Sequence, residues 1–251
     1  MATQPQLGIL TKWWPWFGAH HSYHPCSNGK NLRKMVSSFA NTPFYLHNPS
    51  MQTSPTESAQ CVIAMAASVG GLNALSVILG ALPAEFPAAI GIVMHLSPDY
   101  KSLLVDILKC RTPLQVKQAR SGDVLHHSQV FVAPPNHHLS VTAGGILKLS
   151  SDHADKIHYA RPSAEPLFAS VAEVYRNHAI AVVLTGGDGD GSMGVQIISK
   201  NGGQVIAQDR PTSQDFSMPE TAISTGDVDF ILPLEGIAPK LIELVRACKG
   251  A

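Results

Sequence analysis

From residue 61 onward, the sequence alternates short apolar runs with longer segments whose apolar residues recur at helical spacing. Three of the apolar runs, at 61–66, 89–94 and 180–184, have the length of a strand and contain no charged residue. Strands that are apolar on both sides are buried on both sides, and parallel strands need a crossover segment between them. The alternation therefore predicts an α/β domain with a doubly wound, mainly parallel sheet and helices on both faces.

The other elements follow from the same two periods and from the residues that interrupt them. We predict strands at 61–66, 89–94, 114–117, 130–133, 139–141, 146–149, 180–184, 204–207 and 228–232, and helices at 71–82, 99–108, 164–176, 192–200, 219–225 and 234–247. Gly144 and Gly145 separate two of the short strands, which predicts a small hairpin there. The run Arg161-Pro162-Ser163 should cap the helix that begins at 164.

The first 58 residues differ from the rest of the chain. They are rich in Pro, Ser, Thr, Asn and His, and they show no sustained period of either kind. Such a segment buries too little apolar surface to offset the entropy lost on ordering. We therefore predict a disordered leader at 1–58 and one folded domain at 59–251.

Charge and composition limit the classes of partner. Lys plus Arg and Asp plus Glu each number 18, so the net charge is zero and no basic field is available for nucleic acid. No apolar run approaches the roughly 20 residues of a membrane span, and the N-terminus lacks the order of a signal peptide. The four cysteines form no CxxC pair, which fits a reducing compartment. We expect a cytoplasmic protein with no nucleic-acid partner and no membrane insertion.

A serine, a histidine and a loop with two aspartates follow three of the predicted strands. Ser68 stands between the first strand and the first helix, His95 directly follows the second strand, and Asp188 and Asp190 lie in the glycine-rich loop after 180–184. In doubly wound sheets, sites lie at the carboxyl ends of strands, so these side chains should meet at one edge. A serine at a strand–turn–helix junction has an exposed hydroxyl, as in a nucleophile elbow. Serine, histidine and acidic residues at one edge predict a Ser-His-Asp triad, in a chain order that differs from that of the α/β-hydrolases.

These residue types suit the hydrolysis of an ester or an amide. His95 would accept the proton of Ser68 as the hydroxyl attacks the carbonyl, and would then return it to the leaving group. A carboxylate of the loop after 180–184 would fix the imidazole tautomer and stabilise the imidazolium. The backbone amides of Val69 and Gly70 are placed to bind the oxyanion. The chemistry needs no metal ion and no organic cofactor.

Several separate blocks of the sequence resemble the catalytic domain of the chemotaxis protein-glutamate methylesterases (CheB). The blocks are Ala67-Ser68 with Gly70-Gly71, His95 after its strand, Val132-Ala133-Pro134 with His138, Arg161-Pro162-Ser163 with Leu167-Phe168, Leu184-Thr185-Gly186 with Asp190-Gly191, Ile206-Ala207-Gln208, and Met218-Pro219 with Ala222. They run in the family's order through nearly all of the predicted folded part. Carried over by position, the resemblance makes Ser68 the nucleophile, His95 the general base and Asp190 the orienting carboxylate.

For function, the resemblance implies a serine esterase of chemotaxis signal transduction. Such a hydrolase removes methyl esters from glutamate side chains of chemoreceptor helices and releases methanol; deamidation of glutamines is a second implied activity. The expected partners are methylated chemoreceptor helices and a separate regulatory chain. Around the oxyanion and the rim of the site we expect Val69, Gly70, Gly187, Arg161 and Met218.

Four positions depart from the family's usual pattern. The family usually has Gly-Ala-Ser-Thr-Gly-Gly around its serine, whereas this chain has Ala66 and Val69, and Val69 removes a hydroxyl beside the nucleophile. Gly187 stands where the family has a methionine that helps to form the oxyanion pocket. Asp188 adds a carboxylate two residues before Asp190 and is a rival partner for the histidine. The family's receiver domain is not found before residue 61, so we expect no control by phosphorylation in cis.

Two other classes of function are compatible with parts of the sequence. Residues 189–194 fit the GxGxxG pattern of dinucleotide-binding loops, and Asp209 follows about 20 residues later. However, that pattern begins too late after its strand, and Asp188 and Asp190 would repel a pyrophosphate. The same loop lacks the glycine and the glutamate of a calcium-binding loop. A catalytically weak signalling or scaffold domain with the same fold is the remaining alternative.

Overall fold

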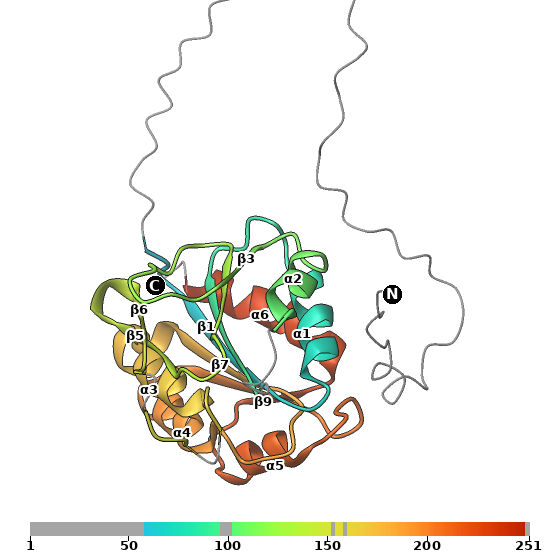
Figure 1. Cartoon of the computed structure of the whole chain (residues 1–251). Helices are drawn as coiled ribbons and strands as arrows, with labels where there is room; N and C mark the ends of the chain where they lie inside the picture. The colour runs from blue at the N-terminus through green and yellow to red at the C-terminus, as the bar shows by residue number, and fades with distance from the viewer. Residues whose placement is uncertain (1–57, 96–101, 152–153, 158–159, 249–251) are drawn as a thin grey trace, which may run out of the picture. The chain divides into compact units, whose positions relative to one another are not determined.

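The computed structural model describes residues 58–95, 102–151, 154–157 and 160–248. The predicted leader lies outside these residues except for Ser58, so its disorder stays a prediction. The described part forms an α/β domain in which a parallel sheet lies between two layers of helices (Figure 1). None of its helices is long and apolar enough to cross a membrane.

The main sheet has seven strands, all parallel, in the order β3-β4-β2-β1-β7-β8-β9. They are β1 (Val62–Ala67), β2 (Ala89–Met94), β3 (Gln115–Gln118), β4 (Gln129–Val132), β7 (Ala179–Val183), β8 (Gln204–Gln208) and β9 (Phe230–Leu232). From β1 the chain builds one half of the sheet, then returns to β7 and builds the other half. The predicted doubly wound sheet is confirmed, and its switch point lies beside β1, where such folds place their sites.

Two layers of helices cover the sheet, as Figure 1 shows. One layer holds α1 (Gly71–Gly80), α2 (Leu104–Lys109) and α6 (Leu234–Cys248); the other holds α3 (Ala164–Tyr175), α4 (Ser192–Lys200) and α5 (Ser217–Ser224). Ile63 and Met65 of β1 belong to the core under the first layer. Val62 and Ala64 belong to the core under the second. Because β1 is buried on both faces, its sequence is apolar throughout.

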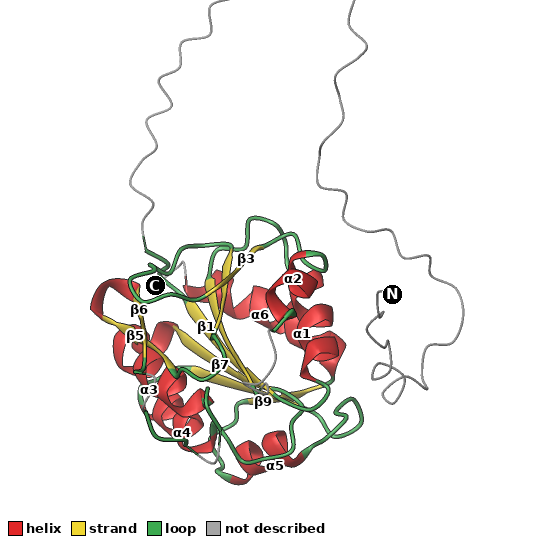
Figure 2. Ribbon diagram, viewed as in Figure 1, coloured by secondary structure: helices red, strands yellow, loops and turns green. Residues whose placement is uncertain are grey.

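A small hairpin lies apart from the main sheet and packs on α3 (Figure 2). Its strands, β5 (Leu139–Thr142) and β6 (Ile146–Leu149), pair antiparallel. The turn passes through Gly144, whose φ of 79° is in the left-handed region that glycine adopts without strain. The hairpin predicted from Gly144-Gly145 is therefore present.

The starts of two helices differ from the prediction, and in each a polar side chain two residues before the first helical residue accepts that residue's amide. The helix predicted at 99–108 begins at Leu104, whose amide donates to the Ser102 hydroxyl at 3.2 Å; residues 99–101 lie outside the described part. The helix predicted at 219–225 begins two residues earlier, at Ser217. There the Asp215 carboxylate accepts a hydrogen bond from the Ser217 amide at 3.0 Å.

The carboxyl ends of the three central strands lie side by side. Hydrogen bonds continue one step beyond the strands: His95 N donates to Ala67 O at 3.1 Å, and Ser68 N donates to Thr185 O at 3.0 Å. The register pairs Ala67 with Met94, so Ser68 and His95 are the next neighbours across the edge. The fold thus gathers Ser68, His95 and the loop after β7 at one edge of the sheet.

Candidate active site

Ser68 is the first residue after β1, at the point where the chain turns into α1. Gly70 has a φ of 80°, and the Gly71 amide donates to Ser68 O at 2.9 Å, which closes the turn. A β-carbon at Gly70 would lie 2.8 Å from Gln214, so both the backbone and the space require glycine. The serine side chain is half-buried and its neighbour Val69 is exposed. This is the geometry of a nucleophile elbow.

Gly186 and Met218 form the floor beneath Ser68. A β-carbon at Gly186 would lie 2.0 Å from Met218 Sδ and 2.9 Å from Ser68 Cβ, so no larger residue fits. The Met218 amide donates to Gly186 O at 2.9 Å, and its side chain is buried. Met218, predicted at the rim, thus supports the nucleophile from below.

Thr185 ties together the loops around the serine. Its hydroxyl lies 2.8 Å from Val69 O and accepts a hydrogen bond from the Asp215 amide at 2.9 Å. Its own amide donates to the buried side chain of Gln208 at 3.0 Å. These contacts give a structural reason for a threonine and a glutamine at the ends of two neighbouring strands.

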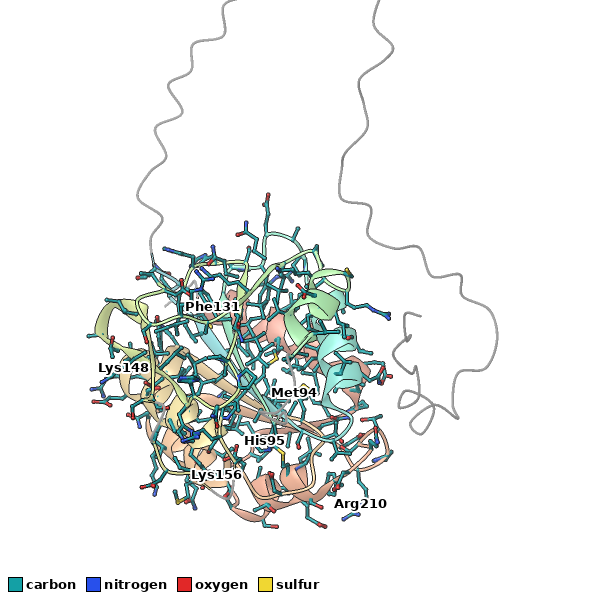
Figure 3. All side chains as sticks on the ribbon, in the orientation of Figure 1. Met94, His95, Phe131, Lys148, Lys156 and Arg210 are labelled. Atoms are coloured by element: carbon teal, nitrogen blue, oxygen red, sulfur yellow. The ribbon has the colours of Figure 1, made fainter. Side chains whose placement is uncertain are left out.

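His95 contacts a carboxylate through each of its two ring nitrogens. Its Nε2 lies 2.9 Å from Asp190 Oδ2, and its Nδ1 lies 3.0 Å from Asp188 Oδ2. Figure 3 labels His95 close to Met94, the last residue of β2. Within the described part of the chain, the Ser68 hydroxyl makes no hydrogen bond to His95. The structure therefore brings all three predicted triad residues to one edge, with the histidine held between two aspartates.

Asp190 is buried and firmly held. Besides His95, its carboxylate accepts hydrogen bonds from the Ser163 hydroxyl and from the Ala164 amide at the start of α3. Ser163 is held in turn, because its amide donates to His138 Nδ1 at 3.1 Å. The predicted cap at 161–163 is present, since Ser163 Oγ accepts from the Glu165 amide. The second contact of the Ser163 hydroxyl, to Asp190, could not be read from the sequence.

A buried glutamate fixes the other end of the aspartate loop. Glu165 Oε1 accepts hydrogen bonds from the Gly191 and Met193 amides at 3.0 and 3.1 Å, and Oε2 accepts from Gly194. The carboxylate of α3 thus caps the start of α4. Sequence reasoning missed Glu165, because a cap from another helix leaves no local pattern.

The pKa values at the site follow from burial and from neighbouring carboxylates. Burial lowers the pKa of His95, but its hydrogen bonds to Asp188 and Asp190 outweigh burial and raise the pKa to about 9. Burial also raises the pKa of Glu165, against the opposing effect of its backbone hydrogen bonds. At neutral pH, His95 in this arrangement is therefore an imidazolium paired with two carboxylates.

The oxyanion side of the site is formed by backbone and by an acidic loop. Within the described residues, the amides of Val69 and Gly70 donate to no protein acceptor, so both are available to a ligand. A β-carbon at Gly187 would lie 2.9 Å from Asp215 Oδ2 and 3.9 Å from Val69 Cγ2. The space that the family's methionine would fill is thus bordered here by a carboxylate and a valine.

Two other predicted or suspected residues take structural positions. Arg161 donates two hydrogen bonds to Asn136 Oδ1, from Nε at 3.0 Å and from Nη2 at 2.7 Å. Its Nη1 donates to Ala154 O. These hydrogen bonds hold the segment before α3 in place. His138 is buried, and its Nε2 donates to Asp155 O at 2.8 Å. Both residues hydrogen-bond near Ser163, whose hydroxyl donates to Asp190.

The loop at 189–194 is already occupied by protein. The amides that a pyrophosphate would need, at the start of α4, donate to the Glu165 carboxylate. A nucleotide would have to displace that buried carboxylate and also face two aspartates. Among the described residues, no group of three or more His, Cys, Asp or Glu is arranged to hold a metal ion.

Comparison with known proteins agrees with this geometry. The family model described as CheB methylesterase matches residues 63–241. The protein-glutamate methylesterase/protein-glutamine glutaminase 2 of Cupriavidus metallidurans is 37% identical over 221 residues, which are 88% of this chain and 63% of that protein. The protein-glutamate methylesterase/protein-glutamine glutaminase of Pyrococcus horikoshii is 36% identical over 78% of this chain and 54% of that protein.

A solved structure shows the same fold. The catalytic domain of the Thermotoga maritima CheB methylesterase superposes with a TM-score of 0.70 at 36% sequence identity. The match covers 73% of this chain and 98% of that domain. By contrast, the chain spans between half and two thirds of the length of the curated relatives named above.

Proposed function

The chain belongs to the CheB methylesterase family, and on that premise we propose that it hydrolyses glutamate methyl esters of chemoreceptors in the cytoplasm. Deamidation of glutamine side chains would use the same site. The names of the relatives support the reaction class. The observation that carries the proposal is the meeting of Ser68, His95 and Asp190 at one edge, with His95 Nε2 2.9 Å from Asp190 Oδ2.

The first half of the reaction forms an acyl-enzyme. The Ser68 hydroxyl attacks the ester carbonyl, and His95 takes its proton through Nδ1, the nitrogen that does not face Asp190. The Val69 and Gly70 amides bind the oxyanion; one such donor is worth about 2.7–4 kcal/mol in a serine hydrolase. The intermediate then collapses, and methanol leaves with the proton from His95.

The second half regenerates the enzyme. Water attacks the acyl carbon as His95 accepts its proton, and the proton returns to Ser68 Oγ as the bond to the glutamyl carbonyl breaks. Asp190 holds the imidazole and its positive charge through both steps. The product is a glutamate carboxylate, which Asp188 and Asp215 repel, so the acidic rim favours its release.

The test is a single substitution. Ser68→Ala is expected to lower methanol release from a methylated chemoreceptor fragment on the order of 10⁶-fold and to abolish labelling by a fluorophosphonate. The matched control is Ser76→Ala, because the Ser76 hydroxyl donates to Leu72 O at 2.7 Å within α1. Unchanged release by Ser68→Ala, with the melting temperature preserved, would refute the nucleophile assignment.

One observation favours a second candidate, a catalytically weak domain of the same fold. The contact between His95 Nδ1 and Asp188 occupies the nitrogen that the reaction needs. If the wild-type chain neither labels nor releases methanol at any pH from about 6 to about 10, the scaffold alternative holds.

A further inference from the structure

We propose that Asp188 is a positioning residue that latches His95 away from Ser68, so that the nucleophile is activated only when this contact opens. The inference rests on the proposed function, because a latch on the general base matters only if Ser68 is the nucleophile. Asp188 lies outside the three triad residues and occupies a position where the chain departs from the family's usual glycine-rich loop.

The first argument is the hydrogen-bonding capacity of the imidazole. A ring nitrogen can accept the proton of a serine only when it carries a lone pair. Here Nε2 faces Asp190 at 2.9 Å and Nδ1 faces Asp188 at 3.0 Å. Since a carboxylate accepts and does not donate, both nitrogens carry protons in this arrangement. In the latched state, neither nitrogen can act as a base toward Ser68.

The second argument is that the two aspartates are not equivalent. Asp190 is fully buried and also accepts from Ser163 and Ala164, so its contact with Nε2 is fixed. The Asp188 side chain is 38% exposed. Its other oxygen, Oδ1, accepts a 3.2 Å hydrogen bond from the Asp190 amide, which orients the carboxylate toward the histidine. Of the two contacts, the one at Nδ1 is the one that can open.

The third argument concerns the charges around the ring. Asp188 and Asp190 face the ring from the loop before α4. The Asp215 carboxylate, in the loop before α5, repels that of Asp188. The Glu165 carboxylate of α3 repels that of Asp190. The acidic surroundings favour the charged imidazolium, and the hydrogen bond to Asp188 raises the pKa of His95 more than any other contact does. Removing that one carboxylate should therefore shift the balance toward neutral imidazole.

The opening step is a proton loss. The imidazolium gives its Nδ1 proton to solvent base, the Asp188 contact loses its donor, and the Nδ1 lone pair becomes free to accept the Ser68 hydroxyl proton. With a His95 pKa of about 9, about 1% of the molecules are open at neutral pH. A substrate or a regulatory chain that draws Asp188 away would open the rest.

The experiment compares Asp188→Asn with wild type across pH. The first readout is the rate of fluorophosphonate labelling of Ser68, and the second is the NMR titration of the His95 ring. For Asp188→Asn we expect the midpoint of both curves to fall by one unit or more from about 9, and labelling at pH 7 to rise about tenfold or more. The labelling rates should converge at high pH, where the latch is open in both proteins.

Two further variants make the result decisive. Asp106→Asn removes the same charge from an exposed position of α2, where the carboxylate lies 3.9 Å from Lys109 Nζ, and should leave both midpoints unchanged. Asp190→Asn should slow labelling at every pH, because it removes the orienting carboxylate. An unchanged midpoint in Asp188→Asn, or a loss of labelling at every pH like that of Asp190→Asn, would overturn the latch. Failure of all variants to label would refute the proposed function instead, and the NMR midpoint would still report on the latch.

Discussion

The Asp190 carboxylate connects three parts of the molecule at the scale of one residue. It faces His95 at the end of β2, accepts from Ser163 in the cap of α3, and accepts from the first amide of that helix. A carboxylate that receives several hydrogen bonds in a buried site is strongly favoured in its charged form. One side chain therefore orients the base and positions the helix that completes the site.

Replacing this carboxylate by an amide should harm both activity and stability. In Asp190→Asn, one side-chain position becomes a donor and cannot accept from His95, Ser163 and Ala164 together. We expect kcat to fall on the order of 10⁴-fold and the free energy of unfolding to fall by about 1–3 kcal/mol. The matched control is Asp229→Asn, which also alters a carboxylate that accepts a backbone amide, that of Val205, but far from the site. A variant with activity within tenfold of wild type would contradict the assignment.

The positions of single site residues could be read from the sequence, but their contacts could not. The ends of the apolar strands predict Ser68 and His95, because parallel strands end at one edge, and the family resemblance adds the choice of Asp190 over Asp188. Asp188 was recognised as a rival carboxylate. That it takes Nδ1 while Asp190 takes Nε2 depends on the path of the loop, which no residue pattern determines.

Between elements, the strongest polar link at the site is the cap that α3 gives to α4. Glu165 accepts three amides at the start of α4, and the loop with Asp188 and Asp190 directly precedes that start. The two helices also pack closely, since a β-carbon at Gly194 would lie 2.5 Å from Phe168 Cβ. The cap therefore fixes where the aspartate loop ends.

Removing the charge of this cap should loosen the loop. We expect Glu165→Gln to lower the free energy of unfolding by about 1–3 kcal/mol, because an amide cannot satisfy the same three donors. Hydrogen exchange should speed up at the Gly191, Met193 and Gly194 amides. Glu173→Gln, on the exposed side of α3, is the control. Equal exchange rates in both variants would show that α4 keeps its start without the cap.

The helices and strands were predictable where burial determines which positions of an element are apolar. Strands such as β2, at 89–94, matched because both of their faces are buried, and the helix at 192–200 matched because one face is. Helix starts at Leu104 and Ser217 differ from the prediction, because a first amide that is accepted by Ser102 or Asp215 leaves no periodic pattern. The strands predicted at 114–117 and 130–133 are present as β3 and β4 at one end of the main sheet, a place that their own residues do not determine.

At the scale of the whole molecule, an electrically neutral chain concentrates negative charge at one edge of its sheet. The switch in strand order brings together segments near 68, 95, 163 and 188, and His95 pairs there with the carboxylates of Asp188 and Asp190. The ion pairs of His95 therefore contribute to the free energy of folding as well as to the geometry of the site. This coupling makes the stability of the domain depend on pH.

The sign of that dependence follows from the direction of the shift. The pKa of His95 is about 9 in the fold and about 6.5 in an unfolded chain, so its contribution is complete below pH 6.5 and is lost as pH rises through 9. At 1.36 kcal/mol per unit, the loss amounts to about 3 kcal/mol. Cys248 acts in the opposite direction in this range, because the hydrogen bond from Cys61 lowers its pKa to about 7.

A comparison of wild type with a His95 variant separates the effect of His95 on stability from that of Cys248. We expect the free energy of unfolding of wild type minus that of His95→Gln to shrink by about 3 kcal/mol between about pH 6 and about pH 10, because the thiols cancel in the difference. Denaturant titrations at several pH values provide the measurement. His178→Gln, at the amino end of β7 and so at the opposite edge, serves as the control. A difference that stays constant with pH would mean that the two aspartates do not hold a protonated histidine, and the latch at Asp188 would lose its physical basis.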